Sequence, residues 1–328
     1  MQSLAPDKGL YMPSNIPVLR PNLIAHLSSL SFQEIGFEVS KSLMKDYIPS
    51  HEFKDIIDNA INFPAPVTML SDTIGSLELW HGPSLAFKDF GARYMAALMS
   101  YFIRNEDKNI TILVATSGDT GGAVAAGFYD TPGIEVIILY PSGKVSDLQE
   151  KQLTTLGKNI YAVEINGSFD DCQALVKEAF LDQDLKNKYN LSSANSINIA
   201  RLIPQSFYYF EAFKQVSGMT KEVVFSVPSG NFGNLTAGLM AKKMGLPVKR
   251  FIAATNINKI VPEYLETGSY HPIPSKSTIS NAMDVGSPSN FVRILDIYKN
   301  DFKAISHDIS GFWLDDEGTK EADRKTHV

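Results

Sequence analysis

The fold is decided by one stretch of the sequence, Ile110-Thr111-Ile112-Leu113-Val114-Ala115-Thr116-Ser117-Gly118-Asp119-Thr120-Gly121-Gly122. Its first part is apolar or β-branched throughout and predicts a buried β-strand, and the glycine-rich turn that follows opens a segment with helical spacing. A strand that passes through a tight turn into a helix is the first half of a βαβ unit. The stretch therefore predicts a parallel sheet covered by helices.

The same alternation of strands and helices runs through most of the chain. Further strands are predicted at Val67–Leu70, Leu77–Trp80, Glu135–Tyr140, Asn159–Glu164, Val223–Val227 and Arg250–Ala254. Helices are predicted at Pro21–Ser29, Ser31–Met44, Glu52–Asn62, Phe87–Ile103, Thr120–Phe128, Ser146–Thr155, Phe169–Phe180, Ile199–Val216 and Phe232–Met244. After Thr255 the alternation fades, and Pro262–Pro288 is expected to be a long loop region. We therefore expect an α/β protein with mostly parallel sheets.

Length and composition narrow the class of protein. The chain has 328 residues, enough for two domains of roughly 100–200 residues each. Its 44% hydrophobic and 20% charged residues exclude a mostly disordered chain. The net charge of −6 argues against a strongly basic nucleic-acid-binding protein. A single cysteine, Cys172, excludes an internal disulfide framework and a cysteine-rich metal site, and no metal-ligand spacing is convincing.

The sequence shows no sign of a membrane or secretory segment. No apolar run approaches the ~18 residues that a membrane-spanning helix needs. The first residues contain no basic region followed by an apolar stretch. We therefore expect a soluble, cytoplasmic protein with no membrane or nucleic-acid partner.

A lysine stands in an unusual place at the start of a predicted helix, within His81-Gly82-Pro83-Ser84-Leu85-Ala86-Phe87-Lys88-Asp89-Phe90-Gly91-Ala92-Arg93. With Ser84 or a neighbour as the cap, Lys88 falls in the first turn, where the helix dipole disfavours a positive charge. Phe87 and Phe90 would exclude water, and both effects favour the neutral amine. A neutral amine is what Schiff-base chemistry requires. A solvated surface lysine is an equally weighted alternative.

Two glycine-rich turns each follow a predicted strand and open a predicted helix. They are Thr116–Gly122, with the hydroxyl groups of Ser117 and Thr120, and Pro228–Asn234. Such turns present backbone N–H groups to an anion. Neither matches the nucleotide-binding patterns G-x-x-x-x-G-K-[ST] or G-x-G-x-x-G. Together they suggest a site for two anionic groups, such as two phosphates; the alternative is that the glycines serve packing alone.

A third polar cluster, Ser193–Gln205, leads into another predicted helix. If Asn198 caps that helix, Asn198 and Arg201 are three residues apart and share a face. An arginine fork with amide donors at a helix start suits a phosphate or a carboxylate. Taken alone, an arginine at this spacing is more often part of a surface ion pair. Tyr208 and Tyr209 on the same helix are expected in the core or at a domain interface.

Together these motifs resemble the threonine synthase family, within the fold-type-II enzymes that use pyridoxal 5′-phosphate. The resemblance runs from Leu4-Ala5-Pro6-Asp7-Lys8-Gly9-Leu10-Tyr11-Met12-Pro13 to about Asn290, with His81–Arg93 as its strongest part. Asn281–Gly286 is also similar to a family segment, but its role is unassigned.

The resemblance also implies the architecture. It implies two open, mostly parallel sheets flanked by helices, as in tryptophan synthase β, with the usual C-terminal part lacking. The implied domains are an N-terminal region at residues 1–80, a large cofactor domain of residues 81–105 and 218–328, and a small α/β domain at 106–217.

The resemblance assigns roles to residues of this sequence. Lys88 is implied as the Schiff-base lysine and the catalytic residue. The residues implied in cofactor binding are Lys88, Ser117, Asp119, Gly230, Asn231, Phe232, Gly233 and Asn234. The residues implied in substrate binding are Ser84, Ser117, Thr120, Asn195, Ser196, Asn198 and Arg201. Ser84 stands where the family usually has threonine and keeps the hydroxyl group.

The implied reaction converts O-phospho-L-homoserine and water into L-threonine and phosphate, as a carbon–oxygen lyase of threonine biosynthesis. Lys88 would move the protons at Cα and Cβ, and Arg201 would stabilise the departing phosphate. One alternative is a phospho-lyase or dehydratase of the same fold, which would release a 2-oxo acid. Another is a truncated, non-catalytic fragment. A monomer or a homodimer with a small-molecule substrate is expected.

Overall fold

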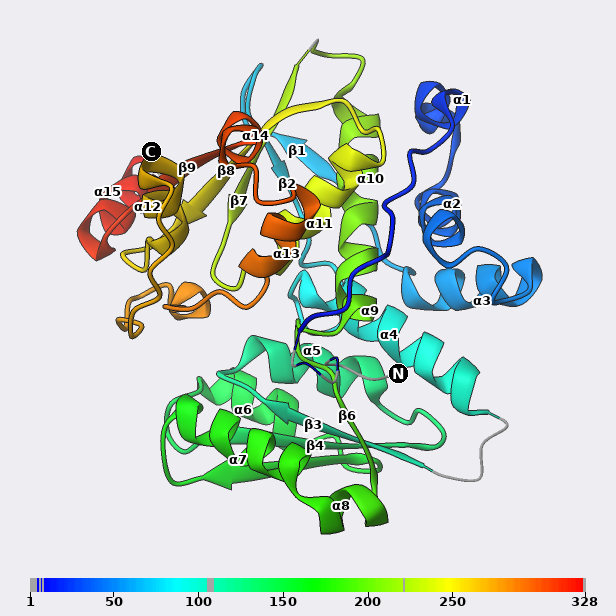
Figure 1. The fold of residues 1–328 in the computed structure, drawn as a ribbon, viewed down its shortest axis with the longest axis vertical. Helices are drawn as coiled ribbons and strands as arrows, with labels where there is room; N and C mark the ends of the chain where they lie inside the picture. Colours follow the sequence, from blue (N-terminus) through cyan, green and yellow to red (C-terminus); the bar gives the residue numbers. More distant parts are fainter. Residues whose placement is uncertain (1–4, 6, 8, 105–108, 221, 327–328) are drawn as a thin grey trace. The chain divides into compact units, whose positions relative to one another are not determined.

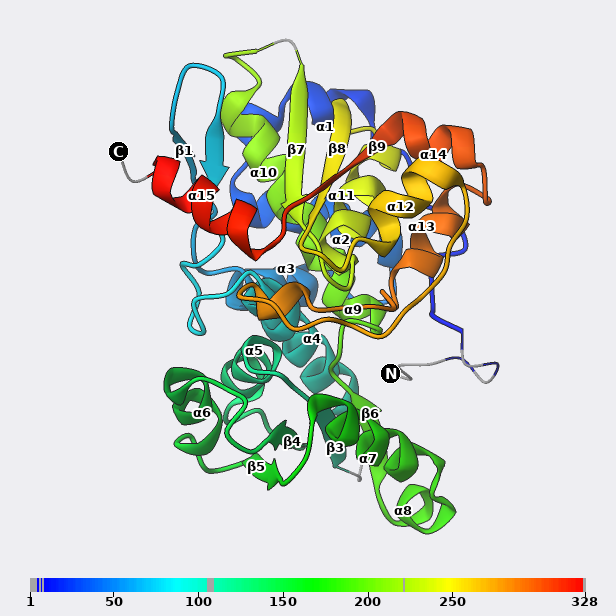
Figure 2. The same cartoon turned by 90° about the vertical axis from the view of Figure 1, so that its left-hand side faces the viewer.

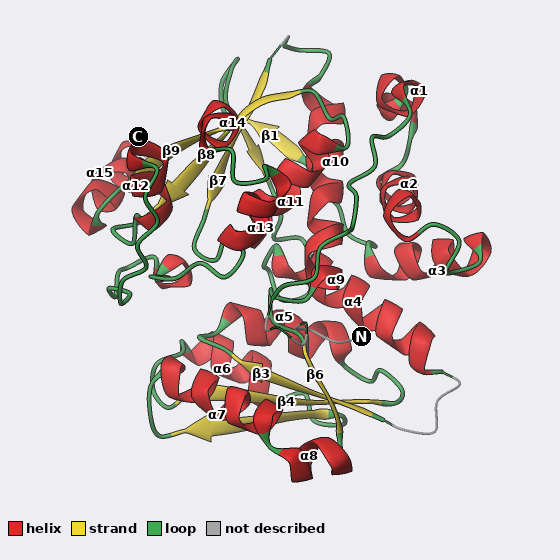
Figure 3. Cartoon of the chain, in the orientation of Figure 1, coloured by secondary structure: helices red, strands yellow, loops and turns green. Residues whose placement is uncertain are grey.

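The fold is seen in a computed structural model that describes residues 5, 7, 9–104, 109–220 and 222–326. Leu4, Pro6 and Lys8 of the N-terminal motif lie outside the described residues. Helices and strands make up most of the described chain (Figures 1 and 3). Contacts divide the chain into two compact units. Unit 1 comprises residues 1–13 and 26–212, and unit 2 comprises residues 14–25 and 213–328.

Unit 1 contains both an antiparallel hairpin and a parallel sheet. Its strands are β1 (Val67–Met69), β2 (Gly75–Leu77), β3 (Ile110–Ala115), β4 (Ile134–Pro141), β5 (Ile160–Ile165) and β6 (Asn190–Ser193). Its helices are η1 (Leu27–Ser29), α2 (Phe32–Met44), α3 (Ser50–Ala60), α4 (Lys88–Ile103), α5 (Asp119–Phe128), α6 (Asp147–Thr154), α7 (Phe169–Leu181), α8 (Gln183–Lys188), α9 (Ile199–Leu202), η2 (Ile203–Ser206) and the start of α10 (Phe207–Val216).

The parallel sheet of unit 1 has the strand order β5-β4-β3-β6 and is covered on both faces (Figure 1). All six residues of β3 are buried, as the continuous apolar run predicts. On one face, α4, α5 and α6 pack against the sheet in a core that includes Met95, Val124 and Leu153. On the other face, α7 places Cys172 and Val176 against the sheet. Cys172 is fully buried.

The N-terminal helices of unit 1 form a second core with α4. Phe90 is fully buried, and its ring centroid lies 5.8 Å from that of Phe32, 4.6 Å from that of Phe63 and 5.3 Å from that of Tyr208. Tyr208 and Tyr209 are core residues of this unit, which is one of the two positions expected for them. Phe90 therefore stabilises the packing of α4, and the expectation that it shields Lys88 gives way to a structural role.

Unit 2 contains a parallel sheet with strand order β7-β8-β9, and Figure 2 shows these strands side by side. The strands are β7 (Val223–Pro228), β8 (Val248–Thr255) and β9 (Ile309–Trp313). The helices are α1 (Pro21–Ala25), the end of α10, α11 (Gly233–Lys243), α12 (Ile260–Thr267), η3 (Asn281–Met283), α13 (Phe291–Ile297), α14 (Phe302–Asp308) and α15 (Asp316–Thr326).

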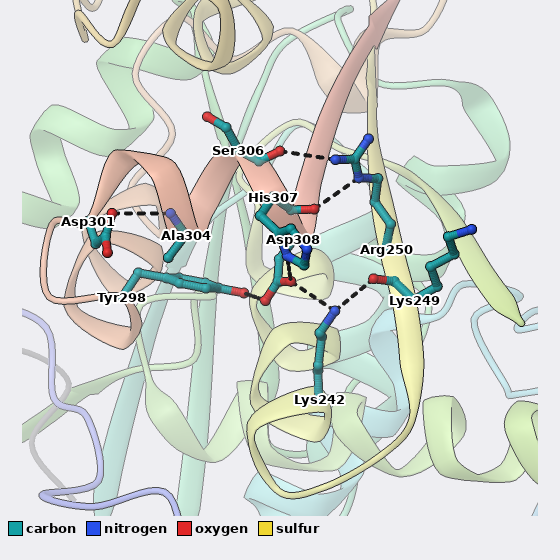
Figure 4. Close-up of polar contacts among 9 residues, drawn as sticks. All are labelled: Lys242, Lys249, Arg250, Tyr298, Asp301, Ala304, Ser306, His307 and Asp308. Atoms are coloured by element: carbon teal, nitrogen blue, oxygen red, sulfur yellow. Dashed lines mark hydrogen bonds and ion pairs between the residues drawn. The ribbon is translucent and has the colours of Figure 1, made fainter.

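A charged cluster around the buried Asp308 ties the C-terminal end of α11 to α14 (Figure 4). Lys242 Nζ lies 2.9 Å from Asp308 Oδ1, and Tyr298 Oη donates to Asp308 Oδ2 at 2.7 Å. His307 Nδ1 also lies 2.9 Å from Asp308 Oδ1. Lys242 additionally donates to the carbonyl oxygen of Lys249 in β8 at 2.8 Å. The cluster thus fixes one end of α11 against the sheet.

The structure confirms the expected α/β class with two parallel sheets, and it also corrects the sequence reading. The strand expected at Leu77–Trp80 forms earlier, as β2, and the loop expected at Pro262–Pro288 begins inside α12. Contacts group α4 with α3, α5 and α9 in unit 1, whereas the expected domains join residues 81–105 to 218–328; those expected boundaries stay a prediction. Among the described residues, none of the helices has both the length and the apolar character needed to cross a bilayer.

Candidate functional site

Lys88 is the first residue of α4, and its amine meets the start of α5. Nζ lies 2.7 Å from Asp119 Oδ2 and donates to Thr120 Oγ1 at 2.9 Å. The side chain of Lys88 is 20% exposed and that of Asp119 28% exposed, so both are reachable from solvent. Packing of α4 on α5 therefore brings together three residues that sequence reasoning placed in the site.

The structure gives Lys88 a partner that the sequence did not indicate, the carboxylate of Asp119. Burial raises the pKa of Asp119, but the Lys88 ammonium and the hydrogen bonds to Asp119 outweigh this effect, so the net pKa lies below its ordinary value. An ionised carboxylate at this distance stabilises the ammonium form of Lys88. The argument for a neutral amine, from the helix dipole and the aromatic neighbours, did not include this carboxylate, and the neutral form stays a prediction.

The turn before Lys88 is held by a buried carboxyl group rather than by a helix cap. Ser84 donates from its N–H to Asp89 Oδ2 at 2.8 Å and from its hydroxyl to Asp89 Oδ1 at 2.6 Å. The residue before α4 is Phe87, whose side chain offers no cap, so the expected cap at Ser84 is wrong. Burial raises the pKa of Asp89, and the hydrogen bonds from Ser84 oppose that shift. Ser84 therefore fixes the approach of the chain to Lys88.

Gly82 makes room for this carboxyl group. A Cβ atom at Gly82 would lie 2.4 Å from Asp89 Oδ2, closer than any packing tolerates. Sequence reasoning did not assign a role to Asp89. The pattern that could have indicated a role for Asp89 is a carboxyl group one residue after the candidate lysine, with Ser84 and Gly82 a few residues upstream.

The turn between β3 and α5 uses its own N–H groups more fully than an open anion site would. Thr116 Oγ1 accepts from the N–H of Gly118 at 3.0 Å and from that of Gly121 at 2.8 Å. The N–H of Thr120 donates to Asp119 Oδ1 at 2.9 Å. These bonds, together with the carboxylate of Asp119, leave this turn poorly suited to a phosphate.

Ser117 lies half-buried in the same turn, with its neighbours held by Thr116. Thr116 is a residue that sequence reasoning missed. A hydroxyl residue at the end of a strand, two positions before a glycine, is the pattern that signals such a turn.

The cluster between β6 and α9 forms as the sequence predicts. Asn198 caps α9, with Oδ1 accepting from the N–H of Ala200 at 3.0 Å. Asn195 and Ser196 lie half-buried in the preceding turn. Asn195 Oδ1 is buried and has no hydrogen-bond partner among the described residues. The cap and the turn place polar side chains beside Arg201.

Arg201 is buried, which excludes the surface ion pair that was its alternative. Its side chain is 2% exposed and donates to the carbonyl oxygen of Ala194, while Nε has no partner among the described residues. Burial lowers the pKa of Arg201 to about 10, against the opposing effect of Asp89 and Asp119. A Cβ atom at Gly91 of α4 would lie 2.9 Å from that Nε, so the glycine admits the guanidinium. A buried donor of this kind suits an anionic ligand.

In unit 2 the turn from β7 into α11 leads into a helix that has no side-chain cap. Phe232, the residue before α11, adopts φ 61° and ψ 10°, and its buried apolar ring offers no helix cap. Gly233 begins the helix, and Asn234 lies half-buried in its first turn. Asn231 Oδ1 accepts from the N–H of Ser289 at 2.6 Å and from its hydroxyl at 2.8 Å. An uncapped helix start after a left-handed residue favours a phosphate.

Each unit contains groups of a kind that pyridoxal 5′-phosphate needs. The cofactor needs a lysine for its aldehyde and backbone donors for its phosphate. Lys88 supplies the amine in unit 1, and the turn from Gly230 to Asn234 supplies the uncapped helix start in unit 2. Within the described part of the chain, His, Cys, Asp and Glu side chains form no group of three or more that could hold a metal ion.

Comparison with known proteins agrees with this chemistry. A family model described as pyridoxal-phosphate dependent enzyme matches residues 77–308, and one described as threonine synthase N terminus matches residues 1–61. Threonine synthase from Escherichia coli strain K12 is 47% identical over 325 residues, which cover 99% of this chain and 75% of that protein. Threonine synthase from Haemophilus influenzae is 49% identical over 317 residues, which cover 96% of this chain and 74% of that protein.

Solved structures give the same result. The crystal structure of threonine synthase from Escherichia coli matches with a TM-score of 0.92 and 46% identity, covering 99% of this chain and 76% of that chain. The pyridoxal-phosphate-bound threonine synthase from Brucella melitensis matches with a TM-score of 0.90 and 34% identity, covering 97% of this chain and 75% of that chain. Because family models, curated relatives and solved structures agree along nearly all of its length, the chain belongs to the threonine synthase family of pyridoxal-phosphate-dependent enzymes.

Proposed function

We propose that this chain binds pyridoxal 5′-phosphate and converts O-phospho-L-homoserine and water into L-threonine and phosphate. The observation that carries the proposal is Lys88 Nζ at the start of α4, 2.7 Å from Asp119 and 2.9 Å from Thr120. Relatives that share close to half of its residues are named threonine synthases, which supports this choice of reaction.

The reaction divides into bonds that this chain must help to break and form. The bond between Cγ and the phosphate oxygen breaks, a proton leaves Cβ and one is added to Cγ, and the hydroxyl group of water bonds to Cβ while its other proton goes to the departing phosphate. When bound, the cofactor withdraws electrons from the carbon that carries the substrate amine. Lys88 Nζ accepts the protons that leave Cα and Cβ, and it returns one to Cα and one to Cγ. Asp119 stabilises Nζ while it holds a proton, because an ionised carboxylate 2.7 Å away favours the ammonium.

The substrate phosphate is assigned to the cluster around Arg201. The buried guanidinium keeps Nε available, and Asn195 and Asn198 line the same turn. Ser196 and Thr120 complete the proposed substrate contacts, together with Ser84 and Ser117. A cation already desolvated by the protein stabilises the charge that develops on a departing phosphate.

The cofactor phosphate is assigned to Gly230, Asn231, Phe232, Gly233 and Asn234 in unit 2, where α11 begins without a side-chain cap. Ser117 and Asp119 in unit 1 are proposed as further cofactor contacts. The cytoplasmic location and the monomeric or homodimeric state expected from the sequence stay predictions, as do the expected domain boundaries.

The test compares Lys88→Ala with Lys158→Ala after addition of pyridoxal 5′-phosphate. Lys158 is a matched control because it also pairs with an aspartate, Asp130, in the same unit but on the surface. Wild type and Lys158→Ala should develop the visible absorbance of lysine-bound cofactor, and borohydride reduction should fix the label on the peptide that contains residue 88. Lys88→Ala should show neither. A label on another lysine would refute the assignment of Lys88.

The choice of reaction is tested by product analysis with O-phospho-L-homoserine. Threonine and phosphate in equal amounts support the proposal. Release of 2-oxobutyrate in place of threonine would identify a lyase of the same fold, and absence of turnover with bound cofactor would favour a non-catalytic fragment.

A further inference from the structure

The segment Asn281–Gly286, to which the sequence gave no role, lies against the turn at Gly230. A Cβ atom at Gly230 would lie 2.8 Å from Met283 Cα and 2.9 Å from the carbonyl oxygen of Ala282. These are backbone atoms that cannot rotate away. The segment therefore packs directly against the turn that precedes α11.

Asp284 anchors this segment through four hydrogen bonds. Its Oδ1 accepts from Asn256 Nδ2 at 2.8 Å, from Thr278 Oγ1 at 2.7 Å and from Asn258 Nδ2 at 3.3 Å. Its Oδ2 accepts from the N–H of Thr278 at 3.0 Å. We call Asn256, Asn258, Thr278 and Asp284 the Asp284 latch.

The latch is fixed to the sheet of unit 2. Asn256 and Asn258 follow β8 directly and are buried, with 2% and 5% exposure. Asn256 Oδ1 accepts from the N–H and from Nδ2 of Asn258, both at 2.9 Å, which orients the two amides. Strand β8 pairs with β7, whose continuation is the turn at Gly230. The latch thus connects the end of β8 to the segment Asn281–Gly286, which packs against the turn that follows β7.

The chain just downstream of this segment makes further hydrogen bonds to the turn. Ser289 donates twice to Asn231 Oδ1, and the N–H of Asn290 donates to the carbonyl oxygen of Asn231 at 3.4 Å. The chain between Asp284 and Asn290 is therefore held at the sheet on one side and at the turn on the other. Loss of the Asp284 hydrogen bonds would release Asn281–Gly286 from Gly230, while the hydrogen bonds of Asn231 would remain.

We propose that Asp284 is a positioning residue for the cofactor phosphate. It holds Asn281–Gly286 against Gly230 and so keeps the turn from Gly230 to Asn234 in the shape that receives the phosphate. The inference rests on the proposed function, which assigns that turn to the cofactor phosphate. A turn held in its binding shape before the ligand arrives avoids the cost of ordering it on binding.

The test measures selectivity for the phosphate group. Asp284→Asn keeps the size of the side chain but replaces one acceptor oxygen with a donor, which opposes either the Asn256 donor at Oδ1 or the Thr278 N–H at Oδ2. Each variant is titrated with pyridoxal 5′-phosphate and with pyridoxal, which keeps the aldehyde but lacks the phosphate, and binding is followed by absorbance. Affinity for pyridoxal 5′-phosphate should fall about tenfold, with affinity for pyridoxal within about twofold of wild type.

Asp296→Asn is the matched control, because Asp296 is an exposed carboxylate of the same unit paired with Lys299 at 3.1 Å. It should leave both affinities unchanged. The double variant Asn256→Asp with Asp284→Asn restores a donor–acceptor pair in the opposite direction and should recover part of the lost selectivity. If Asp284→Asn does not fold, Thr278→Val, which removes one hydroxyl donor, should show the same selective loss at smaller size.

Three outcomes overturn the inference. Unchanged selectivity in folded Asp284→Asn would show that the latch does not act on the phosphate. An equal loss of affinity for both ligands would make Asp284 a residue of general stability. A wild type that binds both ligands alike would remove the phosphate assignment itself, and with it this part of the proposed function.

Discussion

Arg201 is a buried cation with one N–H group that no described residue accepts. Such a group costs free energy unless a ligand satisfies it, because burial removes water from the charge. Gly91 permits this placement, since a Cβ atom there would lie 2.6 Å from the carbonyl oxygen of Arg201. The glycine in α4 and the arginine in α9 therefore belong to one arrangement, in which the buried Nε has no acceptor among the described residues.

Replacing Arg201 with lysine tests that assignment. Arg201→Lys keeps a positive charge but loses the planar fork, so the KM for O-phospho-L-homoserine should rise about tenfold while the absorbance of bound cofactor stays unchanged. Steady-state kinetics and a cofactor titration measure the two effects separately. A parallel loss of cofactor binding would instead assign Arg201 a structural role.

At this scale the sequence identified side chains better than their partners. Lys88 stands out because a positive charge conflicts with a helix start. Asn198 and Arg201 stand out because they complete one, with Asn198 as the cap. The ion pair between Lys88 and Asp119 was not predicted, because it depends on how α4 packs against α5 and not on local spacing. The roles of Thr116 and Asp89 were missed for the same reason, since each depends on contacts that the folded turn creates.

Among the elements, α11 is restrained at both ends. Its start carries the proposed phosphate turn, and its end is held by Lys242, which pairs with Asp308 of α14 (Figure 4). Burial raises the pKa of Asp308, but hydrogen bonds from Tyr298, Lys242 and His307 outweigh it, and the net pKa lies below its ordinary value.

This pairing predicts a loss of stability in acid. Because folding lowers the pKa of Asp308, its stabilisation is present above the unfolded value of about 4 and is lost as pH falls through the lower folded value. Asp308→Asn should lower the free energy of unfolding by about 2–3 kcal/mol near neutral pH. Urea unfolding at several pH values, down to about pH 3, should show the difference from wild type shrinking with acidity. A difference that is independent of pH would contradict the prediction.

The elements that were easiest to predict are those whose own residues are enough to determine the secondary structure. Strand β3 has the predicted bounds, because all of its residues are buried and apolar or β-branched. Strand β6 (Asn190–Ser193) was not predicted, because its residues are mostly polar and become a strand by pairing with β3. Strand β9 was not predicted either, since Gly311 interrupts its apolar pattern. Pairing partners decide such strands, and the local pattern does not show them.

At the scale of the whole molecule, two units with separate sheets carry different parts of the proposed chemistry. Unit 1 contains Lys88 and Arg201, and unit 2 contains the turn from Gly230 to Asn234. The repeated alternation of strand and helix predicted a parallel sheet covered by helices, and the resemblance of the motifs predicted the family and the presence of two sheets. The sequence did not predict that α4 groups with unit 1, because that division depends on contacts made across the sequence.

Cofactor should stabilise the folded chain. A ligand present at 100 times its dissociation constant adds about 2.7 kcal/mol to the free energy of unfolding. Pyridoxal 5′-phosphate should therefore raise the melting temperature by several degrees, and pyridoxal should raise it less. Thermal unfolding of wild type and Lys88→Ala, with and without each compound, measures this. An equal shift in Lys88→Ala would show that the stabilisation does not involve the lysine.

The position of Cys172 gives the molecule a built-in probe of its own motion. It is the only sulfhydryl in the sequence and lies fully covered between α7 and the sheet of unit 1, where burial also raises the pKa of the thiol. An alkylating reagent can reach it only when α7 lifts from the strands. The rate of labelling at this one atom therefore reports how often that layer opens, without any engineered tag.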